Sequence, residues 1–289
     1  MGRIGVIGGS GLYEIAGLKG AEWQTVDSPW GEPSDQILTG SLDGTDLAFL
    51  PRHGRGHVVS PTDINYRANI DVMKRLGVTD IISISACGSF REEMAPGDFV
   101  LVDQFIDRTV NREKTFFGRG CVAHVSIAHP TCSRLRRTVA AASAEAGIPH
   151  HPHGCYLAME GPQFSSLAES KMYRESWGCD VIGMTNMPEA KLAREAEICY
   201  LTVAMVTDYD SWHPDHGEVD INQILAVAHG NADKAKTLIK TVAPMLADRA
   251  ETCPEGCDRA LEFAVLTAPD KRDPELVAKL DAVAGRILG

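Results

Sequence analysis

Two carboxylates follow an apolar segment, with one residue between them. Asp208 and Asp210 come at the end of residues 198–207, whose composition is typical of a buried strand. If both side chains enter a closed pocket, burial and like-charge repulsion raise the pKa of one, and that neutral acid can donate a proton near neutral pH. An isolated Asp-x-Asp is more often a solvated pair at the start of a loop. Asp208 is therefore a candidate general acid that needs support from other residues.

Two basic side chains follow a second apolar segment. Residues 46–50 run into Arg52 and His53, and glycines at positions 54 and 56 allow a ligand to approach the backbone closely. A guanidinium group can hold two phosphate oxygens at once, so the pair is a candidate phosphate site. The alternative is a solvated basic loop.

A glycine-rich turn follows the first apolar segment, residues 4–7. Residues 8–11 read Gly-Gly-Ser-Gly, and their backbone N–H groups and the Ser10 hydroxyl can surround an anion. A plain tight turn between a strand and a helix is the alternative. A dinucleotide-binding fingerprint needs a third glycine where Glu14 stands, so the turn disfavours NAD.

Hydroxyl groups also end other segments. The strand predicted at residues 80–85 runs into Ser85-Ala86-Cys87-Gly88-Ser89. Ligands of parallel sheets bind where strands end, so we expect three strand ends to converge on one anion site. Residues 160–165 and 183–189 each offer an apolar side chain beside a hydroxyl, and they are less decisive alone.

The cysteines and histidines do not predict a metal site. Cys253 and Cys257 form the one close pair of cysteines, and without a second pair of ligands they are interpreted as surface residues. Residues 150–153 read His-His-Pro-His with no carboxylate or cysteine at ligand spacing, so they too are interpreted as surface side chains. Five further cysteines, in or beside apolar segments, are predicted to be free buried thiols: Cys87, Cys132, Cys155, Cys179 and Cys199.

The elements that must position these groups alternate along the chain. Strands are predicted at residues 4–7, 46–50, 80–85, 98–106, 180–184 and 198–207. Helices are predicted at residues 65–76, 132–146, 165–177, 188–196, 222–246 and 274–288. The pattern predicts the α/β class: a single domain over residues 1–289, with a mixed, mostly parallel central β-sheet flanked by helices. Residues 252–289 form a C-terminal tail whose apolar stretch at 261–266 needs a partner surface.

Composition narrows the function classes. The chain has 289 residues, and its net charge of −11 argues against a nucleic acid as partner. The first residues run into an apolar strand without a charged leader or a long apolar stretch. We therefore expect a cytoplasmic protein that does not bind membranes.

Taken in order, these stretches resemble the methylthioadenosine phosphorylases, a branch of the trimeric purine nucleoside phosphorylase family. The similarity covers nearly the whole chain and is carried by residues 8–11, 52–54, 86–89, 97–98, 103–109, 160–162, 184–185 and 207–210. Several long stretches in the same order are far more specific than any single motif. The resemblance implies a homotrimer that uses inorganic phosphate as co-substrate and needs no metal or organic cofactor.

The resemblance also implies a role for each site residue. Phosphate would contact Ser10, Arg52, His53, Ser85, Ala86 and Thr185, and the ribose would lie over Met184. The purine would lie against Phe164 and Ser165, with Asp208 near N7 and Asp210 near the 6-substituent. The methylthio group would occupy a recess formed by Ile221 and Ile224, completed by His124 and Leu266 of the partner subunit.

The implied reaction is phosphorolysis of 5'-methylthioadenosine to adenine and 5-methylthioribose 1-phosphate, in purine and methionine salvage. Asp208 would protonate N7 while phosphate stabilises and captures the cationic sugar. A 6-amino group donates hydrogen bonds, so a carboxylate suits it better than a 6-oxo group. Relatives that act on 6-oxopurines have Asn near the position of Asp208 and Glu near that of Ser165, so adenine is the predicted base.

Alternatives remain open. Residues 183–187 read Gly-Met-Thr-Asn-Met where animal enzymes have Asn-Met-Thr-Thr-Val, and Gln163 replaces their Arg. A methylthioinosine or 6-oxopurine nucleoside phosphorylase is therefore the nearest rival. A nucleosidase that uses water would not need Arg52 and His53 as a phosphate clamp, and a purine sensor would not need Asp208 as an acid. The fold class alone would also admit an oxidoreductase.

Overall fold

One long strand organises the sheet of this protein. The computed structural model describes residues 2–9, 11–214, 221–247 and 252–289, except for the side chains of residues 221–224. Strand β5 (Val78–Ser89) pairs in parallel with β1 on one side and with β11 on the other. Towards its end, β5 also pairs with β10 in antiparallel fashion. The end of β5 therefore lies between two other strands, where several loops can meet.

The sheet of the described residues is mixed and mostly parallel. The strand order along its main path is β2-β3-β4-β1-β5-β10-β9-β7. Off this path, β11 pairs with β5 and β6, and β6 pairs with β8. The other strands are β1 (Arg3–Gly8), β2 (Lys19–Gln24), β3 (Ile37–Leu42), β4 (Thr45–Pro51), β6 (Phe99–Leu101), β7 (Gln104–Asp107), β8 (His150–His151), β9 (Cys155–Ala158), β10 (Val181–Gly183) and β11 (Cys199–Tyr209). The predicted α/β architecture is confirmed.

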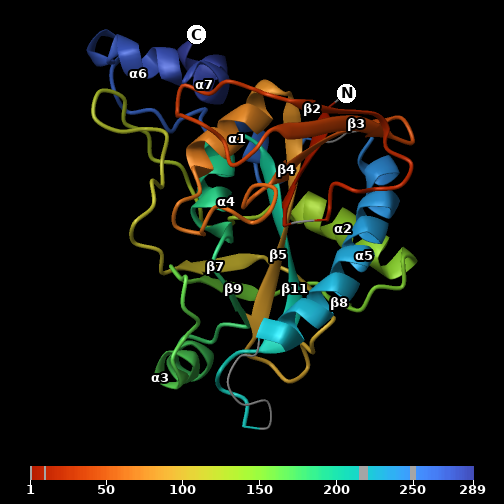
Figure 1. Ribbon diagram of the computed structural model, residues 1–289. Helices are drawn as coiled ribbons and strands as arrows, with labels where there is room; N and C mark the ends of the chain where they lie inside the picture. The colour runs from red at the N-terminus through yellow and green to blue at the C-terminus, as the bar shows by residue number, and fades with distance from the viewer. Residues whose placement is uncertain (1, 10, 215–220, 248–251) are drawn as a thin grey trace.

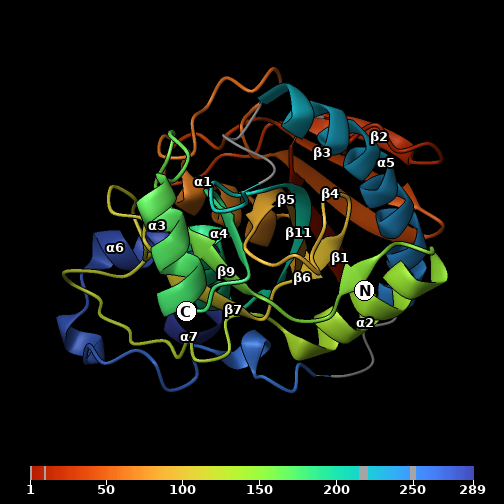
Figure 2. The same cartoon turned by 90° about the horizontal axis from the view of Figure 1, so that it is seen from below.

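Helices cover both faces of the sheet, as Figures 1 and 2 show. Helices α2 and α5 pack together on one face, and α1 and α4 pack together on the other, with α7 against α1. The helices are α1 (Tyr66–Arg75), α2 (Ser133–Glu145), α3 (Leu167–Lys171), α4 (Asn186–Glu195), α5 (Ile221–Leu246), α6 (Pro274–Lys279) and α7 (Asp281–Leu288). Each helix layer buries its apolar side chains in its own core, such as Leu135 and Leu238 on one face and Ile70 and Leu192 on the other. Strands buried on both faces are therefore apolar almost throughout.

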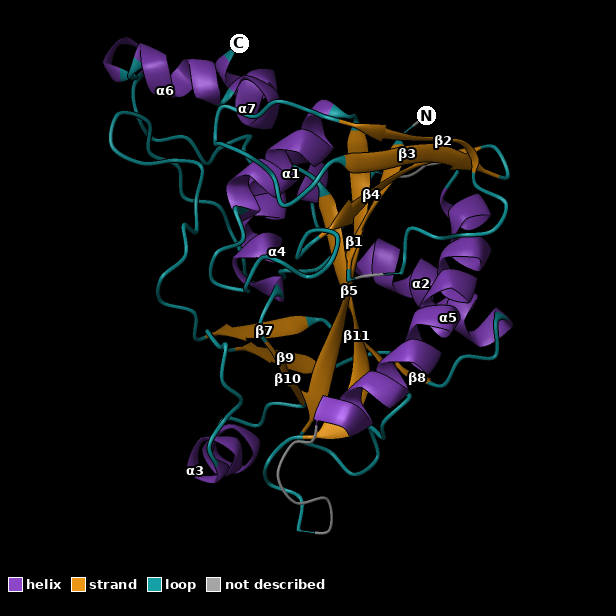
Figure 3. Cartoon of the chain, in the orientation of Figure 1, coloured by secondary structure: helices purple, strands orange, loops and turns teal. Residues whose placement is uncertain are grey.

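Several elements differ from the sequence-based prediction (Figure 3). Residues 98–106 form two strands, β6 and β7, and residues 85–89 lie inside β5 rather than after it. The helix expected from residue 165 begins at Leu167, because Ser166 and Glu169 form a capping box, and it passes into a π-helical turn (Met172–Ser176). The last helix is divided into α6 and α7 at Leu280. Strands β2, β3, β8 and β9 were not predicted, because they are short or carry no apolar run.

The interpretation of the tail cysteines was wrong. Cys253 and Cys257 are buried, not on the surface, and so is most of the cysteine complement. Within the described residues all eight cysteines are free, as predicted for the other five. Among the described residues, no helix is both long enough and apolar enough to cross a membrane.

Candidate active site

The expected site residues gather at the ends of β4, β5, β10 and β11. Along β5, residues 80–85 and 87–89 are buried, whereas Ala86 between them is exposed. An exposed alanine in the interior of a central strand marks an opening in the packing. Ser85, directly beside it, is buried and bonds to Asn186 at the start of α4. The opening at Ala86 therefore lies where the sequence predicts a bound anion.

A β-bulge directs Asp208 towards β5. The parallel pairing of β11 with β5 shifts between Val206 and Asp208, so that Asp208 lies opposite Gly88. Such bulges reorient side chains next to active sites. A Cβ atom added at Gly88 would lie 3.2 Å from Asp208 Oδ2, so glycine leaves the space that the carboxylate uses.

Asp208 has the properties of an acid that is protonated near neutral pH. Burial, reinforced by the charge of Asp210, raises its pKa from an ordinary 3.8 to about 6 although Thr207 opposes the shift. The Thr207 hydroxyl lies 2.7 Å from Asp208 Oδ1 and 3.1 Å from the Cys87 carbonyl oxygen. A protonated Asp208 can donate to Thr207 while Thr207 donates to the carbonyl, so this arrangement accommodates the neutral acid.

Asp210 and Ser165 meet as a recognition pair. The Ser165 hydroxyl lies 2.9 Å and 2.7 Å from the two Asp210 carboxylate oxygens. Asp210 is only 3% exposed, and burial raises its pKa although Ser165 and Ser170 lower it. Phe164, next to Ser165, is 48% exposed. The expected contacts of a purine ring thus lie at one place, beside Asp208.

Arg52 differs from the expected phosphate clamp. Its guanidinium is 1% exposed and forms a bidentate ion pair with Glu189, with Nε–Oε2 and Nη2–Oε1 distances of 2.9 and 3.1 Å. It also donates to the carbonyl oxygens of Ile84 and Ile7. The bidentate grip that we assigned to phosphate is taken by Glu189, and one Nη1 hydrogen of Arg52 has no partner among the described residues.

Glu189 was missed by the sequence analysis. It is fully buried in α4 and accepts hydrogen bonds from Ser83, at 2.5 Å, and from Tyr200, at 2.8 Å. Asn186 donates to the same Ser83 and Tyr200 hydroxyls and accepts from Ser85. The network extends from the ion pair to the Ser85 hydroxyl and so fixes the floor of the anion site. The signal that could have identified Glu189 is a charged residue among the apolar residues of a predicted helix.

His53 is neutral at physiological pH. Burial and the adjacent Arg52 charge lower its pKa to about 4. Its Nδ1 lies 2.9 Å from the Val59 carbonyl oxygen, which can only accept, so Nδ1 carries the proton. The Nε2 lone pair is then an acceptor, suited to a ligand that brings its own hydrogen.

Met184 and Thr185 lie where β10 passes into α4. Thr185 is the N-cap residue of α4, and its hydroxyl makes no capping hydrogen bond among the described residues. Met187 has an extended backbone, so Thr185 precedes a kink in α4 and not the start of a regular helix. Met184 is half-buried and packs against Gly161, where an added Cβ would lie 2.5 Å from its sulfur. The loops on the ribose and purine sides therefore touch.

Arg112, also missed, ties these loops together. Its Nη1 donates to the carbonyl oxygens of Met184 and Met187, at 2.6 and 2.8 Å. Its Nη2 donates to the Glu160 carbonyl oxygen at 2.8 Å, and Nε pairs with the Glu160 carboxylate. The same Nη1 also donates to Tyr66. A buried arginine thus fixes the backbone on both sides of the expected sugar position.

The remaining expected residues are either outside the described part of the chain or lie apart from this group. Ser10 and the side chains of Ile221 and Ile224 lie outside the described residues. His124 and Leu266 lie close to one another in an exposed bridge, formed by the bonds His124 N to Ala264 O and Leu266 N to Val122 O. Leu266 is 65% exposed and Phe263 is 90% exposed in the single chain.

Comparison with known proteins gives a consistent result. The model of the phosphorylase superfamily matches residues 3–244. The chain is 69% identical to S-methyl-5'-thioadenosine phosphorylase of Cereibacter sphaeroides over 99% of this chain and 98% of that one. It is 61% identical to the protein of the same name from Rhodospirillum rubrum, over 99% and 97%.

Solved structures agree with the sequence relatives. A methylthioadenosine phosphorylase from an antarctic soil metagenomic library superposes with a TM-score of 0.93 at 44% identity, over 98% of both chains. Methylthioadenosine phosphorylase from Schistosoma mansoni in complex with adenine superposes with a TM-score of 0.82 at 31% identity, over 94% of this chain and 99% of that one.

Replacing Glu189 tests the ion pair beneath the site. Glu189→Gln leaves the buried charge of Arg52 uncompensated, so we expect the free energy of unfolding to fall by about 3–5 kcal/mol in urea denaturation. Asp281→Asn is the control, because it breaks the exposed pair with Arg75 and should cost about 1 kcal/mol or less. Equal losses in the two variants would contradict a special role for the buried pair.

Replacing Asp208 by Asn tests its raised pKa. The folded protein holds this proton more tightly than the unfolded chain, so wild-type stability falls as pH rises from about 4 to 6. The Asn variant lacks this titration, and its stability relative to wild type should therefore increase by about 1–3 kcal/mol between pH 4 and pH 7.5. The stability of both proteins is measured by urea denaturation at pH 4 and at pH 7.5. A stability difference between variant and wild type that is the same at both pH values would contradict the raised pKa of Asp208.

Proposed function

Because the chain belongs to the phosphorylase superfamily, we propose that it cleaves S-methyl-5'-thioadenosine with inorganic phosphate. The products are adenine and 5-methylthioribose 1-phosphate, and the enzyme is a pentosyltransferase of purine and methionine salvage. The observation that carries this proposal is Asp208 with its raised pKa beside the Ser165–Asp210 pair, at the strand ends that surround the opening at Ala86.

Asp208 acts on the leaving base. In its protonated form it donates to N7 of the purine, and the developing negative charge of the base is neutralised as the glycosidic bond breaks. Asp210 accepts a hydrogen bond from the 6-amino group, while Ser165 holds its carboxylate in place. The Phe164 ring contributes an apolar face to the purine.

Phosphate occupies the opposite side of the sugar. Its contacts are the hydroxyls of Ser85 and Thr185 and the backbone at Ala86, to which the family resemblance adds Ser10 and Arg52. The neutral His53 ring accepts the hydrogen of a monohydrogen phosphate through Nε2. A dianion held beneath the cationic sugar stabilises the transition state and is already positioned to bond to C1'. Base protonation and a bound nucleophile supply the chemistry, so we expect no catalytic cofactor.

The 5' side of the substrate completes the site in a homotrimer. The ribose lies over Met184, and the methylthio group enters a recess of Ile221 and Ile224, closed by His124 and Leu266 of the partner subunit. The exposure of Phe263 and Leu266 supports this arrangement, because an isolated chain seldom leaves large apolar side chains together in water. Residues 252–289 are then the tail of a single domain over residues 1–289, and they supply this contact.

The free thiols bear on the cellular compartment of the enzyme. Eight free cysteines fit a reducing compartment, and we place the enzyme in the cytoplasm. Its net charge of −11 disfavours nucleic acid as a partner. Its ligands are small molecules, a purine nucleoside and phosphate.

Phosphate dependence is the direct test of this function. We expect adenine release from methylthioadenosine to require phosphate, and Asp208→Ala to lower kcat/KM about 100- to 10,000-fold. Methylthioinosine and adenosine serve as competing substrates in the same assay. Adenine release without phosphate would indicate a hydrolase, and a preference for methylthioinosine would overturn the assignment of Asp210.

Leu266→Asp tests the shared site. A charge in the apolar contact should dissociate the trimer, lower the mass measured by light scattering, and raise KM for methylthioadenosine more than KM for phosphate. Met245→Asp, at an exposed apolar residue of α5, is the control and should change neither. An intact assembly with an unchanged KM in the Leu266 variant would contradict the proposed contact.

A further inference from the structure

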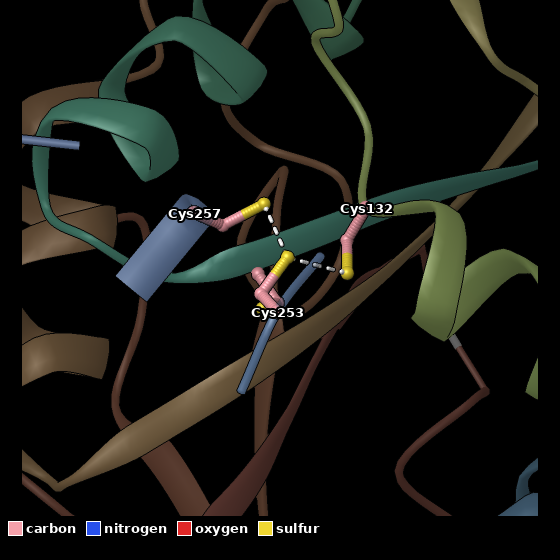
Figure 4. A group of neighbouring side chains, drawn as sticks. Cys132, Cys253 and Cys257 are labelled. Atoms are coloured by element: carbon pink, nitrogen blue, oxygen red, sulfur yellow. Dashed lines mark hydrogen bonds between the residues drawn. The ribbon is translucent and has the colours of Figure 1, made fainter. Parts of the chain in front are cut away.

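Four buried cysteines converge at a point that the proposed reaction does not use. Cys132 is the N-cap residue of α2, Cys199 begins β11, and Cys253 and Cys257 belong to the tail. Their four sulfur atoms all lie within 4.8 Å of one another. Figure 4 shows three of them, with Sγ distances of 3.3 Å from Cys253 to Cys132 and 3.1 Å from Cys253 to Cys257. Two residues of the core thus supply the second pair of ligands that the sequence did not reveal.

The two sulfur distances lie between that of a disulfide and that of a zinc site, so the thiols are not disulfide-bonded and would move slightly apart around an ion. A disulfide requires sulfur atoms about 2.0 Å apart, and the two measured distances exceed this by more than an ångström. A tetrahedral zinc ion with Zn–S bonds of about 2.3 Å places its sulfur ligands about 3.8 Å from one another. Thiols are weak hydrogen-bond donors, so contacts among four of them give little reason to cluster. A closed set of four sulfur ligands is the usual composition of a structural zinc site.

The surroundings suit a negatively charged metal centre. A zinc ion with four thiolates carries a net charge of −2. The backbone N–H of Leu135 points at Cys132 Sγ from 3.5 Å, and the N-terminus of α2 adds its positive potential.

Two arginines lie close to the cluster. Arg134 is near enough to Cys199, and Arg194 is near enough to Cys257, for an electrostatic interaction. Arg194 is itself held by the carbonyl oxygens of Glu255 and His129. Such outer contacts are typical of metal sites.

We propose that Cys132, Cys199, Cys253 and Cys257 bind one structural Zn²⁺ ion per chain. On binding, the four thiols release four protons and form four Zn–S bonds, with no change in oxidation state. All four positions are filled by protein, so no position is left for a substrate. Cys199 and Asp208 are nine residues apart on β11, roughly 30 Å, and the ion takes no part in the reaction.

The ion would fasten the tail to the core. Cys253 and Cys257 come after residue 244, where the superfamily match ends, and Cys132 and Cys199 lie within it. Further along, Leu261 N donates to the Glu197 carboxylate, which also pairs with Arg286. Among the described residues of the tail, the zinc ligands come first, and the exposed residues Phe263 and Leu266 follow them closely. Metal loss should loosen the segment that carries them.

Metal analysis of the intact protein tests the proposal. Untagged enzyme, washed with EDTA to remove loosely bound ions, is analysed by plasma mass spectrometry and by zinc release with a mercurial reagent and a chromogenic chelator. We expect one zinc per chain, released as four thiols are modified. In the cobalt-substituted protein we expect the intense visible bands of tetrahedral cobalt thiolate.

Variants locate the ion. Cys257→Ser should lower zinc content at least several-fold and make the tail susceptible to limited proteolysis, whereas Cys155→Ser, a half-buried cysteine outside the cluster, should retain both zinc and resistance. Should Cys257→Ser fail to fold, the metal content of the wild-type enzyme still decides the question. Zinc-free wild-type enzyme from zinc-replete cells, stoichiometric iron in place of zinc, or an intact mass four hydrogens lighter because of two disulfides would each overturn the proposal.

Discussion

The buried ion pair of Arg52 and Glu189 is the constraint on which the anion side of the site depends. Removing either charge leaves the other buried and unpaired, which destabilises a folded protein by about 3–5 kcal/mol. Arg52 follows β4 and Glu189 lies in α4, and Arg52 also donates to the Ile7 carbonyl oxygen near the end of β1 and to the Ile84 carbonyl oxygen in the middle of β5. One interaction therefore sets the relative positions of four elements. The N-terminus of α4 and the Ser85 hydroxyl are fixed as a result.

The base side of the site follows the opposite principle. Asp208 and Asp210 are buried with hydroxyl groups for neighbours, and burial raises the pKa of both. These carboxyl groups lower stability when ionised, which is common where a titrating group serves chemistry rather than folding. The β-bulge at Thr207 and the missing side chain at Gly88 make room for this unfavourable arrangement. The fold tolerates it because the rest of β5 and β11 is apolar and well packed.

The sequence was informative where a side chain that can take part in the reaction comes directly after a predicted strand. Asp208 and Asp210 could be predicted because two carboxylates directly follow an apolar strand, whereas Ser165, which the structure places beside Asp210, was indicated only by the family resemblance. Glu189 and Arg112 were missed, because the ion pair of Glu189 and all the polar partners of Arg112 lie more than forty residues away along the chain. The cysteine cluster was missed for the same reason: only Cys253 and Cys257 are near each other in sequence. Long-range convergence of single residues leaves no local pattern, whereas strands and helices do.

Arg112 bears on how this family can diverge. It holds the segment at residues 184–187 through main-chain carbonyl oxygens, not through side chains. The path of the backbone is therefore largely independent of which residue occupies the half-buried position 184, whereas Met187 is part of the core. Substitutions at position 184 can alter the surface offered to the sugar without displacing the segment itself. Single amino-acid substitutions can therefore change the contacts with the substrate while the backbone that carries them stays in place.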